Sequence, residues 1–251
     1  MVCGVSCSLG SPARAVRPFV TDDARVVGEY LAQAETWVRG DRRSFQHWLL
    51  CAVSPWAPLE LTIGVVHGAS YDGTPAAYAV HGPVLQAKAL LWEPRPNGRP
   101  GLALSFGATA PHGYGAFQQH DWERFGYLAV TESLLSEERL LLHANVGMLV
   151  AGGANGAGDV TTYTWGIGAQ LRVIAGLHVV GEVISGDPYE PTAGGAGQAG
   201  FRYILSDRVQ VDATVGGGLW GETRLPMWGT AGLRLVGGPI DKWFRRPRNK
   251  S

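Results

Sequence analysis

Strict alternation of apolar and polar side chains between residues 160 and 185 limits what this chain can fold into more than any other feature. One set of alternate positions, which includes Tyr163, Trp165 and Val183, is mostly apolar or aromatic. The other set, which includes Gln170 and Glu182, carries nearly all the polar atoms. A period of two indicates strands with two different faces. The apolar face is buried in a soluble sheet, whereas it meets lipid in a transmembrane barrel whose polar face lines the lumen.

The composition of the whole chain favours the membrane barrel. Charged residues make up 17% of the chain, below the roughly 25% usual in soluble domains. Glycine accounts for 36 of 251 residues, about twice its usual share of roughly 7%. Nine Trp and eight Tyr residues suit the aromatic girdles of such a barrel. The 21 basic and 21 acidic residues cancel, so no nucleic-acid partner is expected. Composition alone also permits a glycine-rich soluble β-sandwich.

Twelve segments of about ten residues, each bounded by turn signals, follow one another from Gly28 onward. They cover residues 28–39, 44–54, 59–68, 77–92, 100–110, 124–134, 139–150, 160–172, 177–186, 197–206, 208–219 and 227–237. A tilted strand needs about 9–11 residues to cross a bilayer. Short and long connections broadly alternate, with outer loops expected at 69–76, 111–123, 151–159, 187–196 and 220–226. These features predict an all-β protein, a transmembrane antiparallel up-and-down β-barrel of about 12 strands in the bacterial outer membrane, with both ends in the periplasm.

The two ends of the chain are expected to lie outside the barrel wall. Residues 1–15 resemble the end of a secretory signal peptide, with a small-x-small pattern at Ala13-Arg14-Ala15. Residues 16–237 are predicted as the barrel and begin with a short polar lead-in over 16–27. Residues 238–251 form a basic tail without a strand pattern.

The charged residues on the polar face of the strands are expected to line the lumen. An Arg or Lys facing lipid at the midplane costs about 2–4 kcal/mol, which forces these side chains inward. The predicted lumen-lining residues are Glu35, Glu60, Lys88, Glu132, His143, Gln170, Arg172, His178, Glu182, Arg202, Asp212 and Arg234. Pairing of opposite charges would partly fill the lumen, whereas acids and bases on opposite walls would leave a charge-selective constriction. The sequence leaves both arrangements open.

The same face assignment makes a prediction about substitutions. Arginine in place of outward Val179 or Leu142 is expected to block membrane assembly. Arginine in place of inward Gln170 is expected to be tolerated.

The sequence gives little support to catalytic or metal chemistry. Candidate residues for a Ser–His pair are His81, His143, His178, Ser105, Ser133 and Ser185. No G-x-S-x-G or other nucleophile context surrounds these serines. His112, His120 and Asp121 share one loop, in which solvated side chains are the plainer interpretation. We therefore expect no catalytic residue, no metal site and no cofactor.

Three stretches of the chain resemble a known family. They are RPFVTDDA at residues 17–24, the pattern AxxETWVR at 32–39 and GPVLQAKALL at 82–91. Over most of residues 17–237 the chain is similar to outer-membrane β-barrel transporters of the MetA-pathway phenol-degradation type. The resemblance implies an outer-membrane barrel and a channel for small molecules, aromatic ones among them. It carries no defined functional residues onto this chain.

The function expected from these observations is passive passage of small solutes, aromatic or hydrophobic ones included, through a narrow charged lumen. The partners expected are outer-membrane lipid and an unidentified small solute, with the chain as a monomer. One alternative is a closed structural or partner-binding barrel with a plugged lumen. A second alternative is a lipid-modifying barrel enzyme, which a Ser–His contact at the membrane rim would favour.

Overall fold

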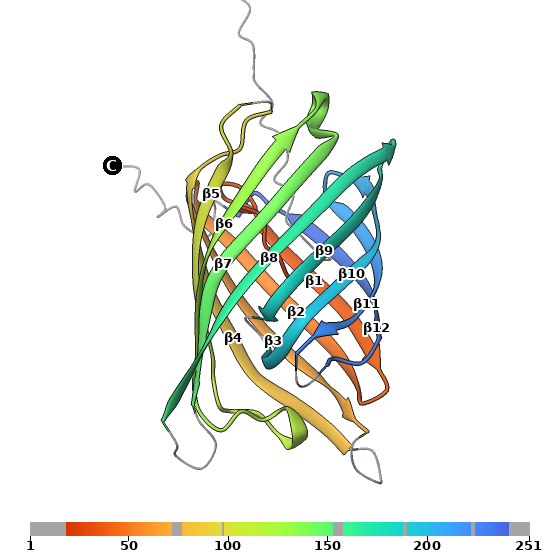
Figure 1. Cartoon of the computed structure of the whole chain (residues 1–251). Coiled ribbons are helices and arrows are strands. Elements are labelled where there is room, and N and C mark those ends of the chain that lie inside the picture. Colours follow the sequence, from red (N-terminus) through yellow and green to blue (C-terminus); the bar gives the residue numbers. More distant parts are fainter. Residues whose placement is uncertain are drawn as a thin grey trace, which may run out of the picture.

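The computed structural model describes residues 19–71, 77–96, 98–152, 158–187, 190–221 and 224–240. Its twelve strands close in chain order into one antiparallel barrel, in which β1 pairs with both β2 and β12 (Figure 1). The strands are β1 (Ala32–Asp41), β2 (Ser44–Trp56), β3 (Leu59–Ser70), β4 (Ala77–Trp92), β5 (Gly101–Thr109), β6 (Glu123–Leu134), β7 (Leu140–Gly152), β8 (Asp159–Ile174), β9 (Leu177–Asp187), β10 (Glu190–Ser206), β11 (Val209–Trp220) and β12 (Trp228–Gly237). This arrangement confirms the predicted fold class and strand number.

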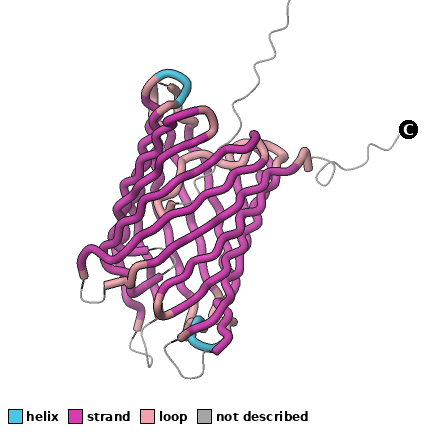
Figure 2. Tube along the Cα trace, turned by 90° about the vertical axis from the view of Figure 1, so that its right-hand side faces the viewer, coloured by secondary structure: helices cyan, strands magenta, loops and turns pink. Residues whose placement is uncertain are grey.

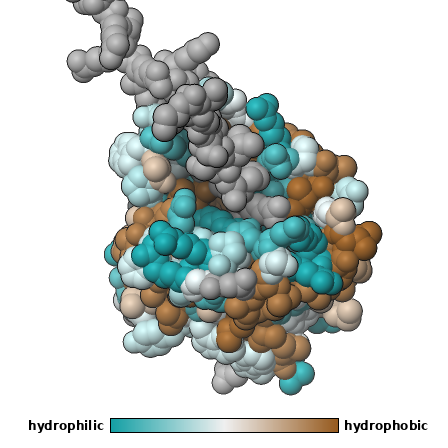
Figure 3. Space-filling model, turned by 90° about the horizontal axis from the view of Figure 1, so that it is seen from above, coloured by the Kyte–Doolittle hydropathy of each residue, from teal (hydrophilic) through white to brown (hydrophobic). Residues whose placement is uncertain are grey.

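The alternation in the sequence becomes the two faces of the wall. On β8, Tyr163 and Ile167 are 76% and 61% exposed, whereas Thr164 and Gly166 between them are buried. The strands run at a steep tilt to the barrel axis (Figure 2), as closure of a barrel requires. Viewed from one end, hydrophilic residues gather around the mouth, and much of the visible outer wall is hydrophobic (Figure 3). The outward face therefore presents the apolar surface that lipid requires.

The two ends of the barrel differ in their longest connection, although two-residue connections occur at both, such as 42–43 between β1 and β2. We call the end at which β1 begins and β12 ends the terminal end, and the opposite end the loop end. Three connections at the terminal end contain only two residues each, at 57–58, 175–176 and 207–208. The loop end carries the long connection 110–122, which holds the 3-10 helix η1 (Gly115–Phe117), while η2 (Ser136–Glu138) lies at the terminal end. Neither helix in the described ranges is long or apolar enough to cross a bilayer.

The loop predicted at 187–196 is wrong in extent. β9 continues to Asp187 and β10 begins at Glu190, so most of the predicted loop is strand. Near the end of the predicted loop, glycine explains the difference. A Cβ at Gly195 would overlap the ring of Trp220 on the neighbouring strand. The glycines that looked like a flexible loop therefore allow close packing of a strand.

The barrel interior contains an apolar core as well as polar groups. Inward Val84, Phe125, Tyr127 and Leu149, from strands β4, β6 and β7, pack with Ala24, which precedes the first strand. Part of the barrel is therefore packed like the core of a soluble protein. The remaining space lies mainly beside β12, β1 and β2.

Candidate functional site in the barrel lumen

Residues 19–27, predicted as a lead-in to the first strand, lie inside the barrel. Thr21, Asp23, Ala24 and Val27 are each at most 1% exposed, although they belong to no strand. We call residues 19–27 the lumen segment. Because wall residues surround it, the segment fills space that a twelve-stranded barrel would otherwise leave to solvent.

Two wall carboxylates hold the backbone of the lumen segment. The amides of Val20 and Thr21 donate to Glu182 Oε1 and Oε2 at 2.7 and 2.8 Å. The amide of Val27 donates to Glu60 Oε2 at 2.7 Å. β9, which carries Glu182, and β3, which carries Glu60, lie six strands apart in the ring of twelve. The segment is therefore held from opposite walls by charge-assisted hydrogen bonds, the stronger kind.

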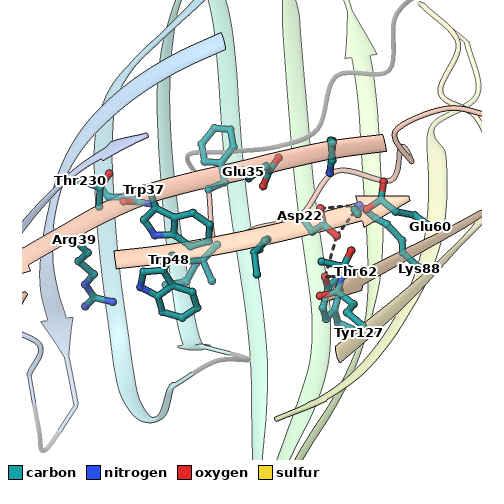
Figure 4. Close-up of a pocket in the computed structure, with 18 of the residues that line it drawn as sticks. Asp22, Glu35, Trp37, Arg39, Trp48, Glu60, Thr62, Lys88, Tyr127 and Thr230 are labelled. Carbon is teal, nitrogen blue, oxygen red and sulfur yellow. Dashed lines mark hydrogen bonds and ion pairs between the residues drawn. The ribbon is translucent and has the colours of Figure 1, made fainter. Parts of the chain in front are cut away.

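The aspartates of the lumen segment make the complementary contacts. Lys88 Nζ lies 2.8 and 2.7 Å from the two carboxylate oxygens of Asp22, and the Tyr127 hydroxyl donates to Asp22 Oδ2 at 2.9 Å (Figure 4). The Thr131 hydroxyl donates to Asp23 Oδ1 at 2.9 Å. Segment and wall thus exchange hydrogen bonds in both directions. Neither aspartate was recognised as a lumen residue from the sequence.

Glycines of β8 make room for the lumen segment. A Cβ at Gly166 would overlap Oγ1 of Thr21, and a Cβ at Gly168 would lie 3.5 Å from the ring of Phe19. Both glycines belong to the inward face. Their alternation is visible in the sequence, and it is the signal that could have indicated chain packed against this wall.

Ten of the twelve predicted lumen-lining residues are buried within the barrel: Glu35, Glu60, Lys88, His143, Gln170, His178, Glu182, Arg202, Asp212 and Arg234. Two of their cations pair with carboxylates inside the barrel. Lys88 meets Asp22, and Arg234 Nε lies 3.5 Å from Glu35 Oε1. The arrangement left open by the sequence is thus the paired one, which partly fills the lumen. A role for these residues in selectivity stays a prediction.

The other two predicted residues lie elsewhere. Arg172 is at the terminal-end rim, where its Nη2 lies 2.8 Å from Glu137 Oε2. The prediction that Glu132 lines the lumen is wrong. Glu132 shares the outward face of β6 with Leu128 and Val130, while Thr131 faces inward. Glu132 stands two positions before the end of the strand, where the cost of a charge facing lipid falls to about 0–1 kcal/mol. The rule that forces charges inward is therefore weak at this depth.

A cavity of about 150 Å³ stays open beside the lumen segment, and we call it the vestibule. Trp37 on β1 and Trp48 on β2 form part of its wall, with their rings stacked 5.0 Å apart at an angle of 9°. Arg39 places its guanidinium carbon 4.6 Å from the centroid of the Trp228 ring. Figure 4 shows Trp37, Trp48 and Arg39 on the side away from Asp22. All four wall residues belong to the loop-end halves of their strands, so the vestibule lies toward that end.

Aliphatic side chains also line the vestibule. Val20 of the lumen segment and Leu225 pack against Ile184 and Trp228. Asp22, Glu60 and Lys88 lie together at the other extremity of the cavity, and Glu35 lies between them and Trp37 (Figure 4). The space therefore combines apolar sides with a few charged groups, which is the usual character of a small-molecule site.

The serine and histidine candidates do not come together. Within the described residues no serine hydroxyl hydrogen-bonds a histidine, and the buried hydroxyls of Ser105 and Ser133 have no partner. His143 Nδ1 instead lies 3.0 Å from the Thr131 hydroxyl, and His81 Nδ1 lies 3.1 Å from the carbonyl oxygen of Gly82. In the same ranges no three His, Cys, Asp or Glu residues form a cluster that could hold a metal ion.

The fold and its surfaces together define a class of protein. A closed antiparallel barrel with apolar side chains outside and polar groups within has the architecture of transmembrane barrels of the bacterial outer membrane, and this chain is such a barrel. More particularly, residues 5–236 match the family described as uncharacterised conserved protein UCP029691, so the chain belongs to that family. The chain matches no curated protein sequence.

Three solved structures with a similar fold are described as an outer membrane channel and two porins. The COG4313 outer membrane channel from Pseudomonas putida F1 aligns with a TM-score of 0.62 at 14% identity, over 86% of this chain and 98% of the channel. The KdgM porin in complex with disordered oligogalacturonate aligns with a TM-score of 0.56 at 9% identity, over 81% and 98%. The NanC porin aligns with a TM-score of 0.52 at 6% identity, over 82% and 98%. At these identities the likeness concerns the fold, and the phenol-degradation type of the resembling family stays a prediction.

Proposed function

We propose that this protein is a passive outer-membrane channel for small solutes, with the vestibule as its entrance from the outside. The observation that carries the proposal is the open, aromatic-walled cavity next to the lumen segment. The similar solved structures support it, because they are described as a channel and as porins. In this view the lumen segment narrows the path, and its displacement lets a solute continue to the periplasmic end.

The loop-end part of the vestibule favours flat, apolar solutes with an anionic group. Trp37 and Trp48 offer aromatic faces, and Val20 and Ile184 belong to the apolar lining of the same cavity. Aromatic contacts contribute about 0.5–1.5 kcal/mol beyond the burial of area. The guanidinium of Arg39 supplies positive charge at the loop end of the site. An aromatic carboxylate combines these properties.

Trp48→Ala tests the assignment of the vestibule. We expect benzoate entry into proteoliposomes to fall by about 2- to 10-fold, the equivalent of one lost aromatic contact. Liposome swelling measures this entry, with galacturonate as a comparison because the similar KdgM porin was solved with oligogalacturonate. Trp165→Ala is the matched control, since Trp165 faces outward and is 41% exposed. Equal benzoate entry through both variants would contradict the assignment, and the absence of any entry through the unaltered barrel would contradict the channel.

A closed structural or partner-binding barrel is the second candidate. The observation that favours it is the lumen segment, whose contacts with Glu60, Glu182 and Lys88 fix it between opposite walls. A closed barrel would pass no solute even after the segment is released. Solute entry by a variant with a weakened segment therefore separates the two functions.

A further inference from the structure

The outer wall carries a polar row where the fold favours apolar side chains. Thr36, His47 and His67 belong to the outward positions of β1, β2 and β3. Thr36 Oγ1 lies 2.7 Å from His47 Nε2, and His47 Nδ1 lies 2.9 Å from His67 Nε2. The ring of Tyr78 on β4 lies 6.0 Å from the ring of His67. None of these four residues lines the vestibule.

Two polar atoms of these four side chains are not used by the hydrogen bonds within the row. Within the described part of the chain, His67 Nδ1 and the Tyr78 hydroxyl make no hydrogen bond. Tyr78 is 57% exposed on the outside of the barrel. His67 stands three residues before the loop-end limit of β3, and Tyr78 is the second residue of β4, so both atoms lie near the boundary between hydrocarbon and water. The carbonyl and phosphate oxygens of lipids are the acceptors available at this level of a membrane.

Either direction of donation along the row is compatible with these distances, and in one of the two the outer end of the row is a donor. If the Thr36 hydroxyl donates to His47 Nε2, then His47 Nδ1–H donates to His67 Nε2. With Nε2 of His67 as the acceptor, its Nδ1 carries the ring proton and is a donor on the outward face, where the ring of Tyr78 lies 6.0 Å from that of His67. Two outward donors match a ligand rich in acceptors. Lipid ester, amide and phosphate oxygens are such acceptors.

A cationic turn lies toward the loop end from the row. Arg42 and Arg43 join β1 to β2, and Arg42 is exposed. Arg43 precedes His47 by four residues, about 13 Å along an extended strand. The carboxylate of Asp41 is engaged within the turn, where its Oδ1 accepts the backbone amides of Arg43 and Ser44 at 2.6 and 2.9 Å. Positive charge at the water boundary and hydrogen-bond donors at greater depth match the layout of an anionic lipid.

We propose that the outer wall over β1 to β4 binds one anionic lipid of the outer leaflet. The lipid phosphate meets Arg42 and Arg43, and its ester or amide carbonyl oxygens accept from His67 Nδ1–H and the Tyr78 hydroxyl. Thr36 and His47 position His67 by fixing its tautomer. This site lies outside the lumen, so it does not depend on the channel proposal.

The test compares lipid retention by folded barrels in native mass spectrometry. The delipidated protein in detergent receives dioleoyl phosphatidylglycerol or dioleoyl phosphatidylcholine at the same ratio. We expect the unaltered barrel to retain phosphatidylglycerol in preference, and His47→Leu/His67→Leu to reduce that retention at least five-fold. Leucine suits a lipid-facing position, so this variant keeps the fold. The gel-mobility shift on heating verifies folding in every sample.

Two further variants separate this site from general attraction to the surface. Arg42→Gln/Arg43→Gln is expected to lose the preference for phosphatidylglycerol while binding both lipids weakly. Ile63→Leu, which alters another outward residue of β3 that is 56% exposed, is expected to retain lipid like the unaltered barrel. Equal retention of the two lipids by the unaltered barrel would overturn the proposal. Full retention by the double histidine variant would overturn it as well, even if the arginine variant lost binding.

Discussion

Replacement of Glu182 by Ala should raise the open probability of the barrel in a planar bilayer. Glu182 accepts the backbone amides of Val20 and Thr21 at 2.7 and 2.8 Å. Hydrogen bonds to a charged group contribute about 1.5–3 kcal/mol each. Loss of both therefore weakens the binding of the lumen segment to the barrel wall by about 3 kcal/mol or more. That difference shifts the equilibrium between the seated and released segment by about 100-fold. Single-channel recording measures the shift directly.

Glu132→Ala is the control for this variant. Both substitutions remove one glutamate from a strand, but Glu132 faces outward and contacts no part of the lumen segment. We expect its conductance to match that of the unaltered barrel. If Glu182→Ala and Glu132→Ala behaved alike, the lumen segment would not obstruct the path.

Val146→Arg should prevent assembly of the barrel in a membrane. Val146 is the central residue of β7 and is 60% exposed on the outward face. Arginine at the midplane of the lipid-facing wall costs about 2–4 kcal/mol, a large part of the stability of a typical domain. The fraction of heat-modifiable protein after refolding into lipid vesicles measures assembly. We expect that fraction to fall by at least ten-fold.

Thr62→Arg is the matched control, because Thr62 lines the vestibule and adjoins open space. Normal assembly of Val146→Arg together with failure of Thr62→Arg would reverse the assignment of the two faces. The sequence-based prediction that Gln170→Arg is tolerated is at odds with the packing around Gln170. Gln170 is 1% exposed and accepts a hydrogen bond from Arg202, so arginine there would bury two guanidinium groups side by side. We now expect this substitution to be disruptive.

The wall of the barrel was predictable because its signal is local. Alternation at Tyr163, Thr164 and Trp165 reports a strand and its faces without any knowledge of the neighbouring strands. The same reasoning placed Lys88 and Arg234 inside, where both are buried. It failed for Glu132 because the cost of a charge depends on depth, which a strand pattern does not contain.

The lumen segment could not be predicted because its contacts are distant in the sequence. Val20 and Glu182 are 162 residues apart, and Val27 and Glu60 are 33 residues apart. The segment belongs to no strand or helix, because its backbone amides bond to side chains of the wall. Its sequence therefore has no repeating pattern of apolar and polar residues. The vestibule was hidden for a related reason. Trp37 and Trp48 meet only through the register of β1 and β2.

A reversible lock on the lumen segment tests the central claim most directly. A Cβ at Gly166 would lie 3.4 Å from Cβ of Thr21, close to the 3.5–4.5 Å range of disulfides. Thr21→Cys/Gly166→Cys, with Cys3, Cys7 and Cys51 changed to Ser, should therefore form a cross-link. Single-channel conductance of this protein is recorded before and after addition of a reductant. We predict no channel steps while the cross-link is intact and discrete steps after its reduction. Identical recordings in the two states, with or without steps, would contradict a lumen path controlled by residues 19–27.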